Sequence, residues 1–278
     1  MKITYSISEL VPYINWVYYF YAWQVKDEAE KQRMYSEALA KLEELDGKYK
    51  VYAVFELFDA NGDGEDIVIR GTRNEKRETR IPCLRQQQGN PPYLCLADFI
   101  RPLNISRSSS LLPPSSESTS KIGLFATTVD IGLETDFDND VYLKMMVQLL
   151  ADRLAEAAAE VLHERVRKEL WGYAKDENLS IPDLLIERFQ GIRPAVGYPS
   201  LPDTSLNFVL DDILDMKQIG IRLTESGAMK PHASVSGMMI SNPKAKYFSI
   251  GKIGEDQLQD YARRRGLPVE VIRKFVNL

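Results

Sequence analysis

The stretch NDVYLKMMVQLLADRLAEAAAEVLHERVRKELWG, residues 139–172, decides the fold, because it carries the longest regular pattern in the chain. Apolar residues recur at every fourth position along it, at Met146, Leu150, Leu154, Ala158 and Leu162. A spacing of three to four residues keeps such side chains on one face of a helix. The stretch therefore predicts one long central helix with a buried apolar face.

The segments on either side of this helix predict strands and shorter helices. Strands are expected at 50–70, 93–100, 121–132, 221–229, 233–241 and 246–251. Further helices are expected at 8–23, 27–45, 206–217, 254–265 and 267–276. No strand–helix–strand unit with a glycine fingerprint occurs, so a doubly wound parallel sheet is not expected. The pattern predicts an α+β fold, in which a twisted antiparallel sheet and segregated helices accompany one long central helix.

The segment DANGDGEDIVIR, residues 59–70, matches the first half of a calcium-binding loop and fails in the second half. The matching residues are Asp59, Asn61, Asp63 and Gly64. The twelfth position needs a bidentate Glu, and here it is Arg70, which would repel a cation. The segment is therefore interpreted as the turn of an antiparallel hairpin.

Composition places the chain among ordinary soluble globular proteins. Of its 278 residues, 44% are hydrophobic and 27% are charged. The net charge of -5 argues against nucleic acid as a partner, because such binding needs a basic surface. The two cysteines, Cys83 and Cys95, show neither a metal spacing nor a disulfide framework, and no metal site is expected. His163 is expected to be at the surface or paired, and a direct role for His232 is left open.

The N-terminal region predicts neither a signal peptide nor a membrane anchor. Residues 1–10, MKITYSISEL, lack an apolar core followed by a cleavage site. The aromatic stretch 10–25 is only 16 residues long and is interrupted by Pro12 and Asn15, whereas a spanning helix needs about 20 apolar residues. A cytoplasmic protein without a membrane partner is expected. A chain that starts at Met1 just ahead of its first helix also suggests a free-standing protein.

The segment NISRSSSLLPPSSESTS, residues 104–120, is expected to be a mobile surface loop. Eight of its 17 residues are Ser, so it cannot bury enough apolar surface to offset the entropy of ordering. We expect a single domain over residues 1–278 that contains this loop. A linker between two domains is the alternative.

The loop GIRPAVGYPSLPD, residues 191–203, is the first candidate for function. Its prolines stiffen the chain and its glycines permit close backbone approach, so it could serve as a plain connector or as a ligand cradle. In a cradle, Arg193 would clamp an anion and Tyr198 would form a wall. On the long helix, Asp152 and Glu156 project from one face with Arg153 beside them, which is also the pattern of a solvated charged face.

Three blocks of sequence together closely resemble the activation domain of cobalamin-dependent methionine synthase. They span residues 152–180, 190–203 and 223–267, and the second contains the motif R-x-x-x-G-Y at 193–198. Shorter segments at 13–20, 83–90 and 93–100 fit the earlier part of that domain, so the resemblance covers essentially the whole chain. Nothing resembles the homocysteine, folate or cobalamin modules of that enzyme, and its D-x-H-x-x-G motif is absent.

The resemblance implies that this chain binds S-adenosylmethionine and presents it to cobalamin held on another module or protein. In that family, a flavodoxin-type donor reduces inactive cobalt(II), and S-adenosylmethionine supplies the methyl group that traps cobalt(I) as methylcobalamin. Such a protein supplies no acid, base or nucleophile, because the reaction needs alignment and exclusion of water. The run ARRRG, residues 262–266, could attract the acidic electron donor, although a helix C-terminus favours cations in any case.

The resemblance also implies a set of site residues. Those expected to bind S-adenosylmethionine are Asn15, Glu156, Arg193, Ala195, Gly197, Tyr198 and Tyr247. Those expected to face the cobalamin are Tyr198, Asp152 and Arg153. The planar fork of Arg193 suits the ligand carboxylate, and Glu156 would complement its ammonium. Backbone groups of residues 193, 195 and 197 could read the adenine ring.

Two positions depart from the family pattern. Asn15 stands where the family has an Asp that contacts the ligand ammonium, and the loss of this charge predicts affinity weakened about tenfold. Asp203 and Thr204 stand where the family has an acid and a His. These departures keep open a docking or regulatory module for a corrinoid protein with weak or lost S-adenosylmethionine binding. A methyltransferase acting on an unrelated small molecule is a further alternative.

Overall fold

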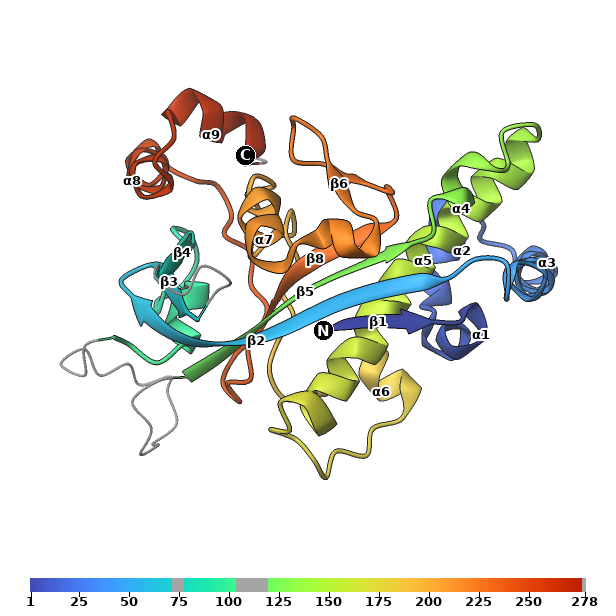
Figure 1. The fold of residues 1–278 in the computed structure, drawn as a ribbon, viewed down its shortest axis with the longest axis horizontal. Coiled ribbons are helices and arrows are strands. Elements are labelled where there is room, and N and C mark those ends of the chain that lie inside the picture. Colours follow the sequence, from blue (N-terminus) through green and yellow to red (C-terminus); the bar gives the residue numbers. More distant parts are fainter. Residues whose placement is uncertain (72–77, 104–119, 277–278) are drawn as a thin grey trace.

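The computed structural model describes residues 1–71, 78–103 and 120–276, and its centre is an antiparallel sheet of six strands (Figure 1). Five of them follow the order β4-β3-β2-β5-β8, and β1 pairs with β2. The strands are β1 (Lys2–Tyr5), β2 (Val51–Asp63), β3 (Asp66–Arg70), β4 (Thr79–Pro82), β5 (Ser120–Val129) and β8 (Ser234–Met239). A separate two-stranded ladder consists of β6 (Arg222–Leu223) and β7 (Met229–Lys230).

The helices gather at the two ends and on the two faces of this sheet. The α-helices are α1 (Ile7–Leu10), α2 (Trp16–Ala22), α3 (Glu28–Leu45), α4 (Gly132–Thr135), α5 (Val141–Arg165), α6 (Ile181–Leu185), α7 (Leu206–Leu214), α8 (Glu255–Arg265) and α9 (Val269–Phe275). Short helical turns are η1 (Val11–Tyr13), η2 (Leu96–Phe99), η3 (Val166–Leu170) and η4 (Met216–Ile219). Figure 1 shows α8 and α9 at the end of the sheet near β3 and β4, and α2 and α3 at the opposite end. The predicted α+β fold with a long helix is confirmed.

The long helix α5 begins where the Asp140 side chain accepts a hydrogen bond from the N–H of Leu143 at 3.0 Å. Its apolar side chains belong to a core cluster that also holds Phe55 of β2 and Phe125 of β5. The neighbouring residues Val54 and Leu124 point to the other face, where they pack in a second cluster with α7. Both faces of the sheet are therefore buried, because side chains alternate across a strand. Full burial of each large apolar side chain contributes about 1.5–3 kcal/mol.

The helix expected over residues 8–23 is wrong, because the chain forms α1, η1 and α2 instead. The N-cap of α1 is Ser6, and its side chain forms a capping box with Glu9. Pro12 lacks the N–H that would continue α1, and Ile14 takes an extended conformation. Asn15 is also extended and caps a new helix, α2. This break matters for function because it places Asn15 at a helix start.

Two expected strands are also absent. Residues 93–100 contain an isolated bridge at Cys95 and the turn η2 over Leu96–Phe99 instead of a strand, and residues 246–251 form no strand. The strand expected over 221–229 is reduced to the short β6–β7 ladder. The expected mobile loop 104–120 lies outside the described residues except for Ser120, which begins β5. The strands before and after it, β4 and β5, belong to one sheet.

The hairpin expected from residues 59–70 is confirmed as β2 and β3, which pair from Asp59 opposite Arg70 to Asp63 opposite Asp66. Arg70 donates from Nη1 to Oδ1 of Asn61 at 2.7 Å, so a cation at the first half of the loop would meet a guanidinium. Within residues 1–71, 78–103 and 120–276, no three His, Cys, Asp or Glu side chains gather in a way that could hold a metal ion. No described helix is long and apolar enough to cross a membrane.

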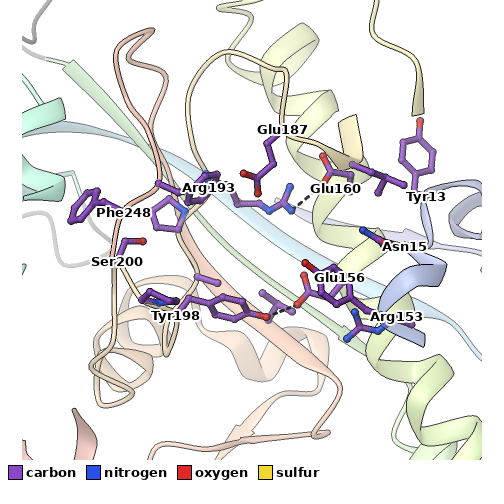
Figure 2. Close-up of a pocket in the computed structure, with 18 of the residues that line it drawn as sticks. Tyr13, Asn15, Arg153, Glu156, Glu160, Glu187, Arg193, Tyr198, Ser200 and Phe248 are labelled. Atoms are coloured by element: carbon purple, nitrogen blue, oxygen red, sulfur yellow. Dashed lines mark hydrogen bonds and ion pairs between the residues drawn. The ribbon is translucent and has the colours of Figure 1, made fainter. Parts of the chain in front are cut away.

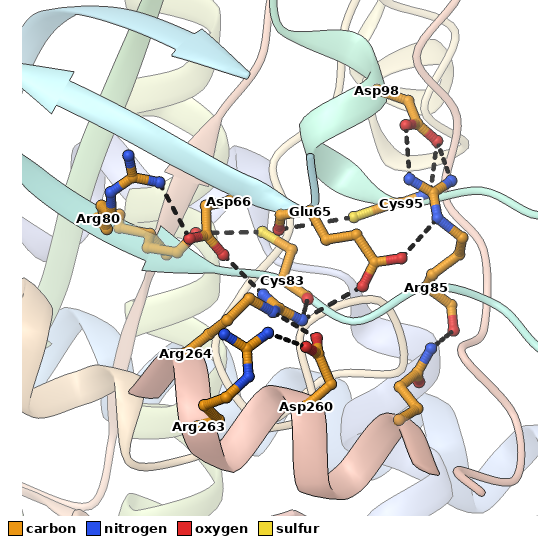
Figure 3. Close-up of polar contacts among 12 residues, drawn as sticks. Glu65, Asp66, Arg80, Cys83, Arg85, Cys95, Asp98, Asp260, Arg263 and Arg264 are labelled. Carbon is orange, nitrogen blue, oxygen red and sulfur yellow. Dashed lines mark hydrogen bonds and ion pairs between the residues drawn. The ribbon is translucent and has the colours of Figure 1, made fainter. Parts of the chain in front are cut away.

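Within the basic run 262–266, Arg264 attaches α8 to residues 65 and 66 at the start of β3 (Figure 3), and Arg265 pairs with Asp203. Arg264 forms ion pairs with Asp260 at 2.7 Å, Asp66 at 2.6 Å and Glu65 at 3.2 Å. Its side chain is only 13% exposed, and that of Arg265 is 8% exposed. An acidic partner could therefore reach only the exposed Arg263, which already pairs with Asp260.

Candidate functional site

A cleft of about 690 Å³ lies between the N-terminal part of the chain, α5 and the loop 191–203 (Figure 2). Its size falls in the range of about 300–1,000 Å³ that is typical of ligand sites. Its polar lining residues are Tyr13, Asn15, Tyr18, Arg153, Glu156, Glu160, Glu187, Arg193, Tyr198, Ser200, Tyr247 and Ser249. The rest of the lining is largely apolar and includes Ala157, Leu185, Pro194, Ala195 and Val235. We call this space the main cleft.

The loop 191–203 lies along β8 and is held to it by backbone hydrogen bonds. Ile192 and Ile240 exchange two of them, at 2.9 and 3.0 Å. Met238 donates to the Pro194 carbonyl at 3.1 Å, and Val196 donates to the Ser236 carbonyl at 2.9 Å. The loop is therefore not a plain connector, because its backbone is fixed along one wall of the main cleft.

Glycines make this close approach possible. A Cβ on Gly237 of β8 would lie 2.3 Å from the Pro194 oxygen and 2.9 Å from the Ala195 Cα. Gly191 has a φ of 84°, and a Cβ there would lie 2.4 Å from the Ile240 oxygen. Both positions thus exclude larger residues, since real Cβ atoms do not approach the backbone so closely.

Arg193 is fixed within the main cleft by several partners. Its Nη2 donates to Oε2 of Glu160 at 3.0 Å, and its Nη1 donates to the Ala159 carbonyl at 3.2 Å. Its backbone N–H donates to the Tyr247 hydroxyl at 2.8 Å. Burial acts to lower the pKa of Arg193, but the charge and hydrogen bond of Glu160, together with Tyr247 and Glu156, outweigh burial and raise it. Arg193 therefore presents a permanent, oriented positive charge.

Glu156 lies in the same cleft, where its Oε1 accepts a hydrogen bond from the Tyr198 hydroxyl at 2.8 Å (Figure 2). Burial, followed by the Glu156 charge, raises the pKa of Tyr198, so its phenol stays protonated and donates this bond. Arg153 is near the Tyr18 ring, 5.7 Å from its centroid. The structure thus brings together the Arg193 and Glu156 predicted to share one ligand.

The remaining predicted ligand contacts occupy different places. Asn15, Ala195 and Tyr247 line the main cleft. Asn15 also accepts a hydrogen bond from the Val17 N–H at 3.2 Å, as the N-cap of α2. Gly197 is not among the lining residues, and its N–H donates to the Leu201 carbonyl at 2.8 Å. Since the N–H of residue 193 is also engaged, the backbone donors at 193 and 197 are already used within the protein.

A second, smaller cleft of about 210 Å³ adjoins the main one on the far side of Tyr198. Arg153, Glu156 and Tyr198 line both clefts, whereas Asp152 and His232 line only the smaller one. Burial raises the pKa of Asp152. The residues expected to face the cobalamin thus lie together, with Tyr198 between the two spaces.

Sequence reasoning missed six polar residues of the main cleft, namely Tyr13, Tyr18, Glu160, Glu187, Ser200 and Ser249. Glu160 lies four residues after Glu156 on α5, so helical spacing alone could have placed it on the same face. Glu187 could not be found in this way, because it lies in the loop after α6 with a φ of 61°.

His163 is fully buried and paired, so of the two expected positions the surface one is wrong and the paired one is confirmed. Its Nδ1 lies 3.5 Å from Nη1 of Arg193, and its Nε2 lies 3.3 Å from the Tyr173 hydroxyl. Burial, aided by the charges of Arg193 and Arg167, lowers the pKa of His163 well below its usual value. A neutral imidazole therefore lies behind Arg193 and adds no second positive charge.

Asp203, which keeps the family's acid beside the departure at Thr204, has a structural role. Its carboxylate accepts a hydrogen bond from the Tyr261 hydroxyl at 2.7 Å and pairs with Nε of Arg265 at 3.3 Å. Both partners belong to α8, so this buried contact fixes the end of the loop 191–203 to the C-terminal helices. The neighbouring Thr204 donates to the Phe275 carbonyl at 3.1 Å.

Comparison with known proteins agrees with this geometry. The family described as "Vitamin B12 dependent methionine synthase, activation domain" matches residues 6–266. A similar solved structure is the crystal structure of the MetH reactivation domain bound to AdoHcy, with 38% sequence identity and a TM-score of 0.88. The match covers 99% of this chain and 88% of that one.

Proposed function

Because the chain belongs to the family of vitamin B12-dependent methionine synthase activation domains, we propose that it binds S-adenosylmethionine in the main cleft. From there it would present the methyl group to a cobalamin held by another module or protein. The observation that carries this proposal is the cleft itself, in which the buried cation of Arg193 lies among acidic side chains. The relative with bound AdoHcy supports the same ligand class.

The charges of the cleft suit an amino acid linked to a nucleoside. Arg193 would bind the carboxylate through its planar fork, and the acidic side chains of α5 would attract the ammonium. The apolar lining suits the ribose and adenine, and the main-chain groups at Ala195 remain close enough to contact the base. The Tyr247 hydroxyl is engaged by the Arg193 N–H and helps to keep the loop in place.

The role proposed for these residues is to position the ligand. A cobalamin bound to the partner would supply a reduced cobalt that accepts the methyl group from the ligand sulfonium. The residues of this chain would orient the sulfonium and exclude water, which needs no nucleophile or base on the chain. Tyr198, with Asp152 and Arg153 beside it, would face the partner because these residues lie on the side of the smaller cleft. A flavodoxin-type protein would supply the electron.

The first test is calorimetric titration of the purified chain with S-adenosylmethionine and with S-adenosylhomocysteine. We expect saturable binding of both ligands. The second test mixes the chain with a cobalamin-carrying methionine synthase module, a flavodoxin-type reductant and S-adenosylmethionine. We expect the absorbance of cobalt(II) cobalamin to convert to that of methylcobalamin, and conversion that does not depend on this chain would contradict the proposal.

One alternative keeps a specific observation in its favour. Asn15 lines the cleft but is uncharged, and the Asp203 carboxylate accepts a hydrogen bond from Tyr261 of α8 and does not line the cleft. Both facts suit a corrinoid-protein docking or regulatory module with weak or lost S-adenosylmethionine binding. Titration distinguishes the two proposals, because the docking module would bind the corrinoid protein but release no binding heat with either nucleoside ligand.

A further inference from the structure

Glu160 is a buried carboxylate with one unused oxygen inside the main cleft. Its side chain is 9% exposed, and its Oε2 is bound by Arg193. Its Oε1 is buried and has no hydrogen-bond partner among the residues that the structure describes. Leaving a buried charged acceptor unpaired is costly, so such an atom indicates a partner that the protein alone does not provide.

The other polar groups nearby are less suited to a cationic ligand group. Glu156 already accepts the Tyr198 hydroxyl at 2.8 Å. Asn15 carries no charge, and its Oδ1 accepts the Val17 N–H. Glu187 is more exposed than Glu160, so screening weakens its ion pairs more, although partial burial in the cleft raises its pKa. Glu160 is therefore the carboxylate that combines burial, an unused acceptor and a place in the cleft.

The position of Glu160 beside Arg193 fits the chemistry of an α-amino acid. The carboxylate and ammonium of such a group are attached to one carbon, so they must bind to neighbouring sites of opposite charge. Glu160 and Arg193 are neighbours of this kind, since Oε2 and Nη2 lie 3.0 Å apart (Figure 2). The second oxygen of Glu160 is buried beside this pair without a partner among the described residues, and Glu160 is one of the residues that line the main cleft.

We propose that Glu160 is a specificity-determining residue, whose Oε1 accepts a hydrogen bond from the ligand ammonium while Arg193 binds the ligand carboxylate. This inference rests on the proposed function and replaces Glu156 as the ammonium partner. Glu156 instead positions Tyr198 at the boundary of the two clefts. Glu160 thereby supplies the negative charge that Asn15 lacks.

The test compares two ligands in wild-type protein and in Glu160→Gln. One is S-adenosylhomocysteine, and the other is its deaminated analogue, which keeps the carboxylate but lacks the amine. We expect wild-type protein to bind S-adenosylhomocysteine about 10- to 100-fold more tightly than the analogue, as a charge-assisted hydrogen bond implies. Glu160→Gln should lose most of this preference while binding the analogue within about twofold of wild type.

Two further variants serve as comparisons. Glu169→Gln makes the same chemical change on an exposed surface pair with Arg165 and should leave both affinities unchanged. Glu156→Gln should keep the preference for S-adenosylhomocysteine over the analogue. Thermal unfolding of each variant shows whether it is folded, and the comparison of the two ligands on wild-type protein needs no variant at all.

Several outcomes would overturn the inference. One is that wild-type protein binds the two ligands equally. Another is that Glu160→Gln loses the same affinity for both ligands. A third is that only Glu156→Gln loses affinity for S-adenosylhomocysteine and keeps its affinity for the deaminated analogue. Equal losses would mean that Glu160 acts only by positioning Arg193. Failure of wild-type protein to bind S-adenosylhomocysteine would instead defeat the proposed function itself, so the two failures are distinguishable.

Discussion

At the scale of single residues, Asn15 combines a structural role with a place in the main cleft. Its side chain caps α2 and lines the main cleft, so any replacement must satisfy both. Asp meets the first requirement as well as Asn does, and adds a charge that the helix N-terminus favours. The same charge would lie near the ligand ammonium.

The first prediction concerns this residue. Asn15→Asp should tighten S-adenosylhomocysteine binding about tenfold, since a charge-assisted hydrogen bond exceeds a neutral one by about 1.4 kcal/mol. Thermal stability should not fall. Calorimetric titration measures the change, and an unchanged dissociation constant would show that position 15 does not contact the ligand charge.

The second prediction uses the buried His163. Its pKa is lowered by burial, so between its folded value and about 6.5 only the unfolded chain binds the proton. The sign follows from linkage, because protons that bind only the unfolded state destabilise the fold as pH falls. The contribution of the neutral His163 to stability is complete above about pH 6.5 and is lost as the pH falls below that value.

Urea unfolding at pH 7 and pH 5.5 should therefore show wild-type protein losing about 1 kcal/mol more stability than His163→Gln. The variant is the matched control, because other groups with raised pKa values, such as Asp152 and Glu187, are present in both proteins. Parallel pH profiles for the two proteins would mean that His163 is protonated in the folded state.

Where chemistry and a motif coincided, the sequence pointed to residues that lie at the main cleft. Arg193 and Tyr198 follow from the resemblance, and the structure places both at the main cleft. The environment of Glu160 and His163 could not be predicted in this way, because their burial depends on how loop 191–203 and the segment after α5 fold over that helix. Helical spacing shows only which face they share.

At the scale of elements, the long helix α5 was predictable because its apolar period extends over many turns. The shorter elements were not, since each depends on a local detail. Pro12 breaks the first helix, and residues 246–251 show strand-like residues without pairing to a neighbour. A strand exists only when another strand supplies its hydrogen bonds, and sequence pattern does not give the partner.

The third prediction tests the contact between β8 and the loop 191–203. Gly237→Ala would bring a Cβ to 2.3 Å from the Pro194 oxygen, which neither backbone can relieve without moving. We expect a loss of about 2 kcal/mol or more in unfolding free energy, together with weaker S-adenosylhomocysteine binding. Urea unfolding and calorimetry provide the two measurements.

Gly254→Ala is the matched control for this substitution. Its Cβ would meet only the ends of the Asp256 and Gln87 side chains, at 2.8 and 2.9 Å, and these can move away. Its stability should stay within about 1 kcal/mol of wild type. If Gly237→Ala behaves like Gly254→Ala, the loop is not held closely against β8.

At the scale of the whole molecule, the main cleft is built from distant parts of the chain. Asn15 precedes α2, Glu160 lies in α5, and Arg193 and Tyr247 belong to later loops. A ligand that contacts all of them links segments that would separate on unfolding. Ligand binding should therefore stabilise the complete fold and not one local region.

The fourth prediction follows from this linkage. S-adenosylhomocysteine at about 100 times its dissociation constant adds about 2.7 kcal/mol, which should raise the melting temperature by roughly 5–10 °C. Arg193→Lys keeps the positive charge beside Glu160 but not the planar fork, so it should reduce the shift at the same ligand concentration to less than half. Differential scanning fluorimetry measures the shift in melting temperature of both proteins. Equal shifts would show that Arg193 does not bind the ligand.

The hydrogen bonds between β8 and residues 192–196 have a consequence for solubility. β8 is the last strand in the sheet order, and a strand in that position exposes backbone groups on which a foreign strand could assemble. The loop occupies those groups, so one segment both shapes the ligand site and prevents aggregation of neighbouring molecules. Evolution of a new ligand specificity through this loop is therefore constrained by the need to keep the protein from polymerising.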